Sequence, residues 1–378
     1  MDMLGGFARA LPGSLLAGGC LRTSVLVWPL GTTSLLALLV ALGCGGGEGG
    51  STSAGQGGAA GASSGTQGGG NSGSGGSLTC TGAPTSGLVL AANTLSLGDE
   101  TPEAWRQFGF NLDGLVGTGP SQNACQPQGG AASAEVHDDG DNGIDNSFGR
   151  NVLPLLSTVV EDASADVNEA ILEGGSTLVV YLEGLGNAPT QNMIPARVYT
   201  GAQTPAAPLF QGGDCWPVDP VSLQTPGALE LPTISYPQSL VVNQEWSGGA
   251  VAQGPLTLRL MLGGHPLVLP LRQVRLLFEL TPTRDGAVNG RLGGMLLLEE
   301  MEEAFRRFLG GIDGALCDEA AVATFLQQLR ETADLLATGV QDPDEVCDAI
   351  SVGLGFTMAP VKLGSIAPPV AVDDPCGP

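Results

Sequence analysis

The sequence predicts a mainly β fold, an antiparallel β-sandwich that carries a helical insertion near its carboxyl end. Sixty glycines and 26 prolines, with only 4% aromatic residues, indicate many turns and few large core side chains. Several short segments are β-branched or alternate apolar and polar residues, which is the pattern of strands. Turn pairs such as Asp-Gly and Asn-Gly separate later segments, as expected for antiparallel neighbours.

The clearest strands lie in the middle of the chain. Residues 177–183, "TLVVYLE", are apolar and β-branched, and residues 255–262, "PLTLRLML", alternate for most of their length. The turn "GGHP" follows, and residues 267–280, "LVLPLRQVRLLFEL", continue the pattern. Because proline cannot donate a hydrogen bond to a neighbouring strand, we expect Pro270 at an edge or a bulge. The closing stretch "ISVGLGFTMAPVKLG" predicts extended structure again.

A switch to helical spacing predicts an insertion near residues 299–350 that packs on the β domain. Two apolar stripes support it, namely Met301, Ala304, Phe305, Phe308 and Leu309, and then Val322, Phe325, Leu326, Leu329, Ala333 and Leu336. A third helix is expected to begin at Asp342. There, Asp342 would be the N-cap, Pro343 the first helical residue, and Glu345 the third residue of a capping box.

The amino-terminal part of the chain predicts export. Two arginines precede an apolar run at residues 35–42, which is too short to cross about 30 Å of hydrocarbon as a helix. We therefore expect residues 1–43 to be a cleaved signal peptide. They end at "ALGC", which resembles the lipobox of bacterial lipoproteins, and this resemblance implies lipidation of Cys44. The alternative is an ordinary signal peptide cut near a chance cysteine. A second match, "LAGGC" ending at Cys20, lacks a long apolar run before it.

Residues 44–79 predict a tether that follows the lipidated cysteine. They are almost entirely glycine, serine and alanine, a composition that cannot bury a core and that spans roughly 30 Å as a flexible chain. In lipoproteins of double-membraned bacteria, an aspartate after the lipidated cysteine usually means retention in the inner membrane. Here that residue is Gly45, so the resemblance implies the outer membrane. Residues 80–378 would then form the single β-sandwich-like domain.

The strong negative charge limits the possible partners. The chain has 14 basic and 38 acidic residues, a formal charge of −24. Removal of the predicted leader leaves 12 basic and 37 acidic residues, a charge near −25. Such a chain repels phosphate groups and anionic lipids, so we expect no nucleic-acid partner. The membrane would be reached through the lipid anchor, and a protein or polysaccharide partner remains open.

Six cysteines remain after Cys20 leaves with the leader and Cys44 takes lipid. An even number outside the cytoplasm predicts disulfides. The absence of C-x-x-C spacing and the presence of only two histidines argue against a zinc ribbon or a redox dithiol. Among fifteen possible arrangements, we favour Cys317 with Cys347, Cys80 with Cys125, and Cys215 with Cys376.

Residues 137–149, "HDDGDNGIDNSFG", form the one candidate metal site. Calcium prefers oxygen ligands, and the glycines between them let the backbone curl so that several oxygens can converge. Crowded carboxylates also repel one another unless a cation neutralises them. The stretch resembles the calcium loops of EF-hand, dockerin and thrombospondin type 3 repeats only in part, because Gly143 and Arg150 replace ligands. The alternative is a set of Asx turns. With an upstream turn, "GFNLDG", the candidate calcium ligands are Asp139, Asp141, Asp145, Asn111 and Asp113.

No catalytic constellation is recognisable. "GASSG", at residues 61–65, matches a nucleophile elbow but lies in the tether, without the strand and helix that the motif needs. His137 and His265 are the only histidines, and neither has the context of a triad. The acidic pairs at residues 299–303 are expected on the solvated face of a helix.

The lipobox, the tether, "FGFNLDG", "DGDNGIDNSFG" and "CDAISVGLGFTMAP" together look like a family of bacterial lipoproteins with no assigned activity. The resemblance implies an envelope location and transfers no catalytic residue. We therefore expect a non-enzymatic, calcium-stabilised, outer-membrane lipoprotein for surface binding or envelope structure. The alternatives are a hydrolase of an envelope or extracellular polymer that uses loop carboxylates, and an accessory subunit of a secretion or assembly complex. A cleft with two converging carboxylates would favour the hydrolase.

Overall fold

Strands dominate the folded part of the chain, which a computed structural model describes at residues 80, 87–117, 123–224, 228–249, 252, 254–370 and 374–377. The predicted leader and tether, with Cys44, lie outside the described residues. The strands are β1 (Gly87–Ser96), β2 (Thr177–Glu183), β3 (Gln191–Gly201), β4 (Cys215–Val218), β5 (Ile234–Val242), β6 (Glu245–Ser247), β7 (Leu256–Leu262), β8 (His265–Leu280), β9 (Ala287–Leu297), β10 (Ala349–Pro360) and β11 (Lys362–Ile366).

The helices are fewer and shorter. They are α1 (Ser133–Val136), α2 (Leu153–Leu156), α3 (Ala163–Leu172), α4 (Leu298–Ile312) and α5 (Glu319–Arg330), with the short helical turns η1 (Ala104–Gln107), η2 (Gln128–Gly130), η3 (Phe148–Val152), η4 (Pro220–Ser222) and η5 (Gly314–Cys317). Among the described residues, no helix combines the length and the apolar character that crossing a bilayer requires.

The strands form one mixed sheet in the order β11-β4-β3-β2-β1-β10-β9-β8-β6-β5. β5 also pairs with β3, so the run of neighbours from β3 to β5 returns to its start, and β7 pairs with β8 off this path. The pairing of β11 with β4 is parallel, and the other strand pairings described are antiparallel. The prediction of a mainly β fold is confirmed. A sandwich is not, because the ladders join the strands into one sheet.

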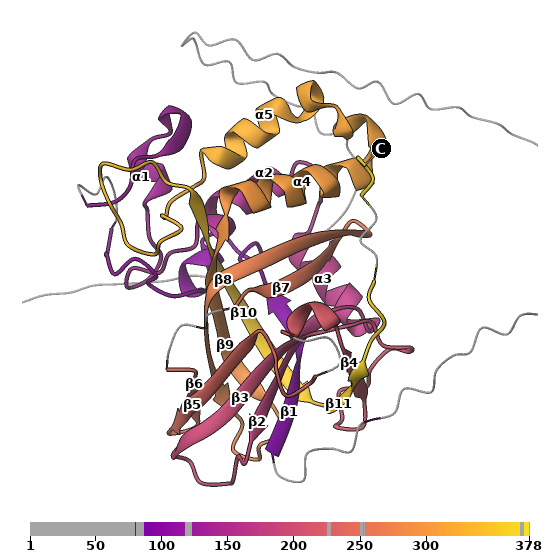
Figure 1. The fold of residues 1–378 in the computed structure, drawn as a ribbon. Coiled ribbons are helices and arrows are strands. Elements are labelled where there is room, and N and C mark those ends of the chain that lie inside the picture. The colour runs from indigo at the N-terminus through magenta and orange to yellow at the C-terminus, as the bar shows by residue number, and fades with distance from the viewer. Residues whose placement is uncertain are drawn as a thin grey trace, which may run out of the picture. The chain divides into compact units, whose positions relative to one another are not determined.

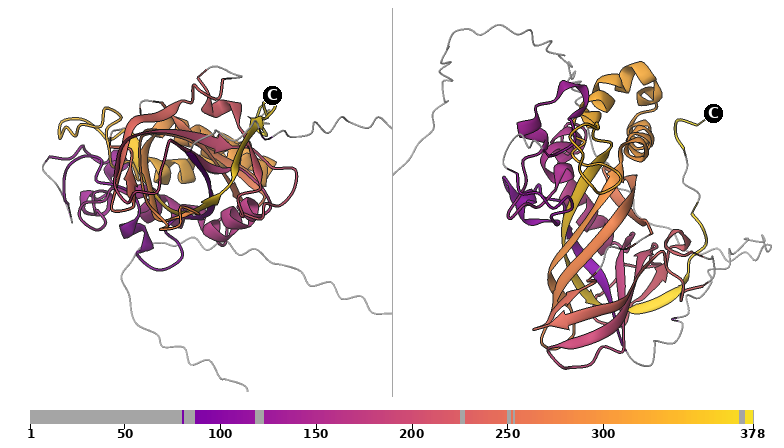
Figure 2. Two further views of the ribbon diagram at one scale, coloured as in Figure 1. Left: turned by 90° about the horizontal axis from the view of Figure 1, so that it is seen from below. Right: turned by 60° about the vertical axis from the view of Figure 1, so that its left-hand side comes forward.

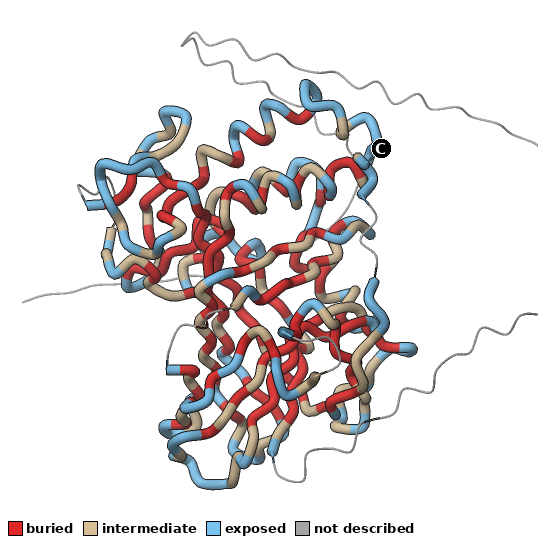
Figure 3. The backbone as a smooth tube through the Cα atoms, in the orientation of Figure 1, coloured by how far each residue is buried: buried red, intermediate tan, exposed pale blue. Residues whose placement is uncertain are grey.

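Burial explains why the predicted strands form. In β2, Leu178 and Val180 are buried in the main core. Val179 and Tyr181, on the opposite face, belong to a second apolar cluster with residues of β4 and β11. A strand buried on both faces needs a continuous apolar run, and this is what "TLVVYLE" supplies. Buried residues follow the strands and the inner sides of the helices (Figure 3).

The predicted helical insertion contains α4 and α5. Met301, Phe305 and Phe308 of the first stripe are buried in the core, and α4 packs on β8. The two helices and the segment that carries α1 lie at the same end of the strands (Figures 1 and 2). Residues Gly73–Pro378 form one compact unit.

The third helix expected from Asp342 does not form. The Asp342 carboxylate accepts the backbone N–H of Asp344 at 3.0 Å, which closes a turn. Beyond it, the carbonyl of Glu345 accepts the N–H of Gln126 at 2.8 Å, and the N–H of Cys347 donates to the carbonyl of Gln126 at 2.9 Å. Pairing with a distant segment therefore overrides the local capping signal, and β10 starts two residues later.

All six predicted cysteines form disulfides, but all three favoured pairings are wrong. The bonds join Cys80 with Cys215, Cys125 with Cys347, and Cys317 with Cys376. Topology decides each partner. Residue 126 bridges to residue 346, which brings Cys125 beside Cys347. Cys317 then bonds to the carboxyl-terminal segment instead.

Candidate functional site

The acidic loop at residues 137–149 packs against segments that are distant in the sequence. Phe110 forms an antiparallel bridge with Asp145 and thereby joins the loop to "FGFNLDG". Ser147, also in the loop, donates its backbone N–H to the hydroxyl of Ser351 in β10 at 2.7 Å. Three of the five features on which the family resemblance rests therefore meet at one place in the fold; the other two, the lipobox and the tether, lie outside the described residues.

Asn146 fixes this junction through its buried side-chain amide. Its Nδ2 donates to the carbonyls of Trp105 at 3.0 Å and Gly353 at 3.1 Å. Its Oδ1 accepts the N–H groups of Gly149 at 3.0 Å and Gly353 at 2.9 Å. A buried amide with all its hydrogen bonds made specifies one arrangement of the surrounding chain.

Three glycines make the close approach possible. A Cβ on Gly353 would collide with the carbonyl oxygen of Phe108, and a Cβ on Gly355 would lie 2.5 Å from the ring of Phe108. A Cβ on Gly293, which is paired with Gly353, would lie 2.6 Å from the ring of Phe110. The glycines of "SVGLGF" thus leave the space in which Phe108 of the "FGF" segment packs on β10, so a larger residue at either glycine would push the two segments apart.

Two of the predicted metal ligands, Asp139 and Asp145, are buried in this junction. Burial, followed by the charges of Asp113 and Asp334, raises the pKa of Asp145 to about 9. Its Oδ2 accepts the N–H groups of Leu112 at 2.6 Å and Asp113 at 3.2 Å. Burial also raises the pKa of Asp139 to about 6, against the effect of a hydrogen bond from a backbone N–H. At neutral pH, Asp145 therefore holds a proton unless a cation replaces it.

Asp334 completes the cluster, and sequence reasoning missed it. It is buried, and its two oxygens accept the N–H of Ser351 at 2.8 Å and the hydroxyl of Ser351 at 2.5 Å. Burial raises its pKa to about 7. The charge of Asp113 raises the pKa of Asp139, Asp145 and Asp334 alike. We call Asp113, Asp139, Asp145 and Asp334 the acidic cluster.

The other predicted ligands have different roles. Asp141 is exposed. Asn111 closes its own turn, because its Oδ1 accepts the N–H of Gly114 at 2.6 Å and its Nδ2 donates to the carbonyl of Leu115 at 2.5 Å. Asp113 belongs to the cluster and also accepts the N–H of Leu115 at 2.7 Å. Local turn formation therefore accounts for Asn111.

His137 lies beside the disulfide of Cys125 and Cys347. Its Nε2 donates to the carbonyl of Cys125 at 3.0 Å, and burial lowers its pKa, so the ring is neutral at pH 7. One nitrogen and two sulfurs lie within 4.8 Å of one another. Since the sulfurs are joined in a disulfide, they cannot act as the thiolate ligands that zinc requires.

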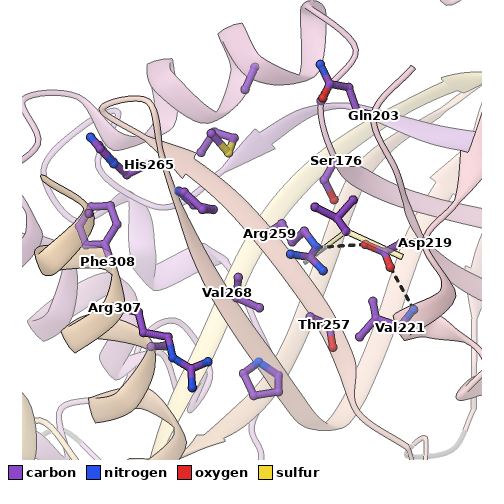
Figure 4. Close-up of a pocket in the computed structure, with 18 of the residues that line it drawn as sticks. Ser176, Gln203, Asp219, Val221, Thr257, Arg259, His265, Val268, Arg307 and Phe308 are labelled. Atoms are coloured by element: carbon purple, nitrogen blue, oxygen red, sulfur yellow. Dashed lines mark hydrogen bonds and ion pairs between the residues drawn. The ribbon is translucent and has the colours of Figure 1, made fainter. Parts of the chain in front are cut away.

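The second candidate site is a cavity of about 870 Å³, which sequence reasoning did not predict (Figure 4). Its floor is one face of the β7–β8 hairpin. Three cross-strand pairs form that face, Thr257 with Pro270, Arg259 with Val268, and Met261 with Pro266. The opposite face of the hairpin consists mainly of leucines buried in the core. The alternation of "PLTLRLML" therefore separates a core face from a cavity face.

The walls of the cavity come from separate elements. Ala304, Arg307 and Phe308 of α4 form one side, and Ser176 and Gln203 lie on the other (Figure 4). The remaining lining residues include small and apolar side chains, one histidine and four carboxylates. None of the acidic cluster lines this cavity, so the molecule has two separate candidate sites.

Most of the carboxylates at the cavity are already in ion pairs. Asp219 pairs with Arg259 at 3.0 Å, and their side chains are only 5% and 16% exposed. A second pair joins Arg307 with Glu303 at 2.8 Å. Glu300 pairs with Arg272 at 2.5 Å, which leaves Glu173 as the lining carboxylate without an ion pair among the described residues.

Comparison with known proteins gave no relative. No protein-family model matches the chain, and no match was found among curated proteins or solved structures. The resemblance to bacterial lipoproteins therefore stays a prediction, and the function has to be argued from the two sites.

Proposed function

We propose that this chain is a lipoprotein of the outer membrane, lipidated on Cys44, whose folded part binds a small molecule without catalysing a reaction. The cavity over the β7–β8 hairpin carries this proposal. Its volume of about 870 Å³ lies within the range of small-molecule sites, and its lining is mainly apolar with a few polar groups.

The charges favour binding over hydrolysis. A glycosidase-type mechanism needs two carboxylates on opposite sides of one bond, with one of them protonated at working pH. The acids whose pKa is raised belong to the acidic cluster and lie outside the cavity. Within the cavity, three of the four carboxylates are in ion pairs with arginine. Hydrolysis of an envelope polymer therefore has no support from this geometry.

Binding can be tested on the oxidised segment 73–378, because it forms one compact unit and contains all three disulfides. The probe is the neutral apolar dye N-phenyl-1-naphthylamine, whose fluorescence rises on leaving water. Val268→Trp fills the cavity and should abolish the signal. Val288→Trp adds the same side chain at an exposed strand position outside the cavity and should not. Equal dye binding by both variants would contradict the proposal.

The anchor rests on the sequence and has its own test. The full chain, produced in a double-membraned bacterium, should incorporate palmitate and fractionate with the outer membrane. Cys44→Ser should abolish both properties, because only the acyl chains hold this acidic protein at a bilayer. Cys20→Ser, at the second lipobox-like match, should change neither. Mass spectrometry that finds residue 44 unmodified at the processed amino terminus would refute the anchor.

We also propose that calcium stabilises the fold at the acidic cluster. Three buried carboxylates have a raised pKa and lie within the influence of Asp113, and a cation would relieve this repulsion. No three carboxylates of the cluster place their oxygens within 4.8 Å of one another in the described residues, so binding would have to draw them together. With an affinity in the weak extracellular range of about 10⁻⁴ to 10⁻³ M, about 10 mM calcium should stabilise the fold by about 1.4 to 2.7 kcal/mol. Calorimetric melting of segment 73–378 in calcium and in chelator tests this. Asp139→Asn should remove the difference, and Asp141→Asn should keep it.

A further inference from the structure

The cavity differs from a fatty-acid site in its charge. Its lining carries four carboxylates, on Glu173, Asp219, Glu300 and Glu303, against two guanidinium groups, on Arg259 and Arg307. Both arginines already have a carboxylate partner. Arg259 pairs with the buried Asp219 at 3.0 Å, and Arg307 pairs with Glu303 at 2.8 Å in an exposed ion pair. Arg307 also lies 3.7 Å from Asp374. An anionic ligand would therefore meet each arginine with a carboxylate already beside it.

The apolar surface runs from the floor to one wall. Val268, Met261 and Pro270 present carbon atoms from the hairpin, and Ala304 and Phe308 present them from α4. A linear hydrocarbon chain lying along this surface would be removed from water, at about 0.8 kcal/mol for each methylene.

Ser176 and Gln203 lie at the opposite wall, whereas Arg307 and His265 lie on the side of Phe308 (Figure 4). The hydroxyl oxygen of Ser176 is buried and has no hydrogen-bond partner among the described residues. Gln203 and Glu173 line the same cavity, and Glu173 has no ion pair in the part of the chain that the structure describes. A buried hydroxyl without a partner costs free energy that a ligand group could recover.

Resting on the proposed binding function, we infer that the ligand is an amphipathic molecule with an alkyl chain and a cationic or uncharged polar head. The chain lies on the hairpin and Phe308, and the head lies by Ser176 and Glu173. The surplus of carboxylates in the lining, together with the net charge of −24, disfavours an anionic head.

Three probes of equal chain length test the head group. Decylamine is a cation at neutral pH, 1-decanol is uncharged, and decanoate is an anion, and each is titrated against bound dye on segment 73–378. We expect decylamine to bind about tenfold more tightly than decanoate at low ionic strength, with a smaller ratio in about 0.5 M salt. Decanoate binding as tightly as decylamine would overturn the inference and leave the binding function standing. Failure of the dye and all three probes to bind would overturn the binding function itself.

Two variants and one control test whether the head group lies at the wall formed by Ser176 and Glu173. Glu173→Gln should weaken decylamine about threefold and leave 1-decanol unchanged, because an exposed ion pair contributes less than about 1 kcal/mol. Glu169→Gln, in helix α3 just before Glu173 and outside the cavity, should change neither affinity. Ser176→Ala should weaken both ligands. If Glu173→Gln has no effect on decylamine, the assignment of the cationic head to this wall is wrong.

Discussion

Replacement of Asp145 by asparagine should remove the dependence of stability on pH above neutrality. The folded chain holds a proton on Asp145 up to about pH 9, whereas the unfolded chain releases it near the ordinary pKa of 3.8. Unfolding in this window therefore releases a proton, and a higher pH favours the unfolded state. The contribution of this proton to stability is fully present below pH 3.8 and is lost as the pH rises to about 9.

The size of this effect on the free energy of unfolding follows from the release of one proton, that of Asp145, when the chain unfolds in this window. Each pH unit costs about 1.4 kcal/mol, so a change from pH 7 to pH 8.5 should lower the free energy of unfolding by about 2 kcal/mol. Asp145 dominates this window, because Asp334 loses about half a proton between pH 7 and 8.5 and contributes only about 0.4 kcal/mol. Asp139 and Asp334 titrate at about 6 and about 7 in the folded chain, and the lowered pKa of His137 keeps its ring neutral above pH 7.

The assay is urea unfolding of the oxidised segment 73–378 in chelator at several pH values. Asparagine cannot ionise, and its side-chain oxygen can still accept the N–H groups of Leu112 and Asp113. Asp145→Asn should therefore unfold with nearly the same free energy at pH 7 and 8.5. Asp141→Asn, an exposed change in the same loop, should retain the slope of the unaltered chain. A slope that survives in Asp145→Asn would refute the assignment of the proton.

Three further predictions concern the junction beside the cluster. Asn146→Ala leaves both the N–H and the carbonyl of a β10 residue without their side-chain partners, and denaturant unfolding should show a loss of about 2 to 4 kcal/mol. Gly353→Ala should destabilise the fold by at least about 2 kcal/mol by the same measurement, because its Cβ meets backbone, whereas Gly213→Ala meets open space and should be near neutral. Non-reducing peptide mapping should find Cys125 linked to Cys347, and serine at both positions should cost about 4 to 5 kcal/mol, since the closed loop is long.

Local pattern was sufficient for some strands. The predicted range 177–183 matches β2, and alternation located β7 and β8 to within two residues. The turn "GGHP" is also present, because Leu262 pairs directly with His265. Periodicity identifies such strands because each has a defined buried face. It did not identify α3, which covers the sheet with a short, weakly apolar helix.

Long-range contacts account for most of what sequence reasoning missed. Asp145 and Asp139 were recognisable from their own loop, but Asp334 joins them from a segment with no polar pattern. The disulfide partners follow the strand order and lie 59, 135 and 222 residues apart. The cavity arises from the docking of α4 over a hairpin face, and no single segment encodes it.

The position of β1 has a consequence for biogenesis. The first strand lies between β2 and β10, and Leu90 is opposite Pro360, near the end of the chain. During synthesis, this strand would have no hydrogen-bonding neighbour on that side until residues 349–360 had been made. A nascent or truncated chain would present open strand edges, which invite aggregation and proteolysis. Molecular chaperones should therefore associate with this protein until β10 is available, and pulse-labelling should show protease resistance appearing only after release.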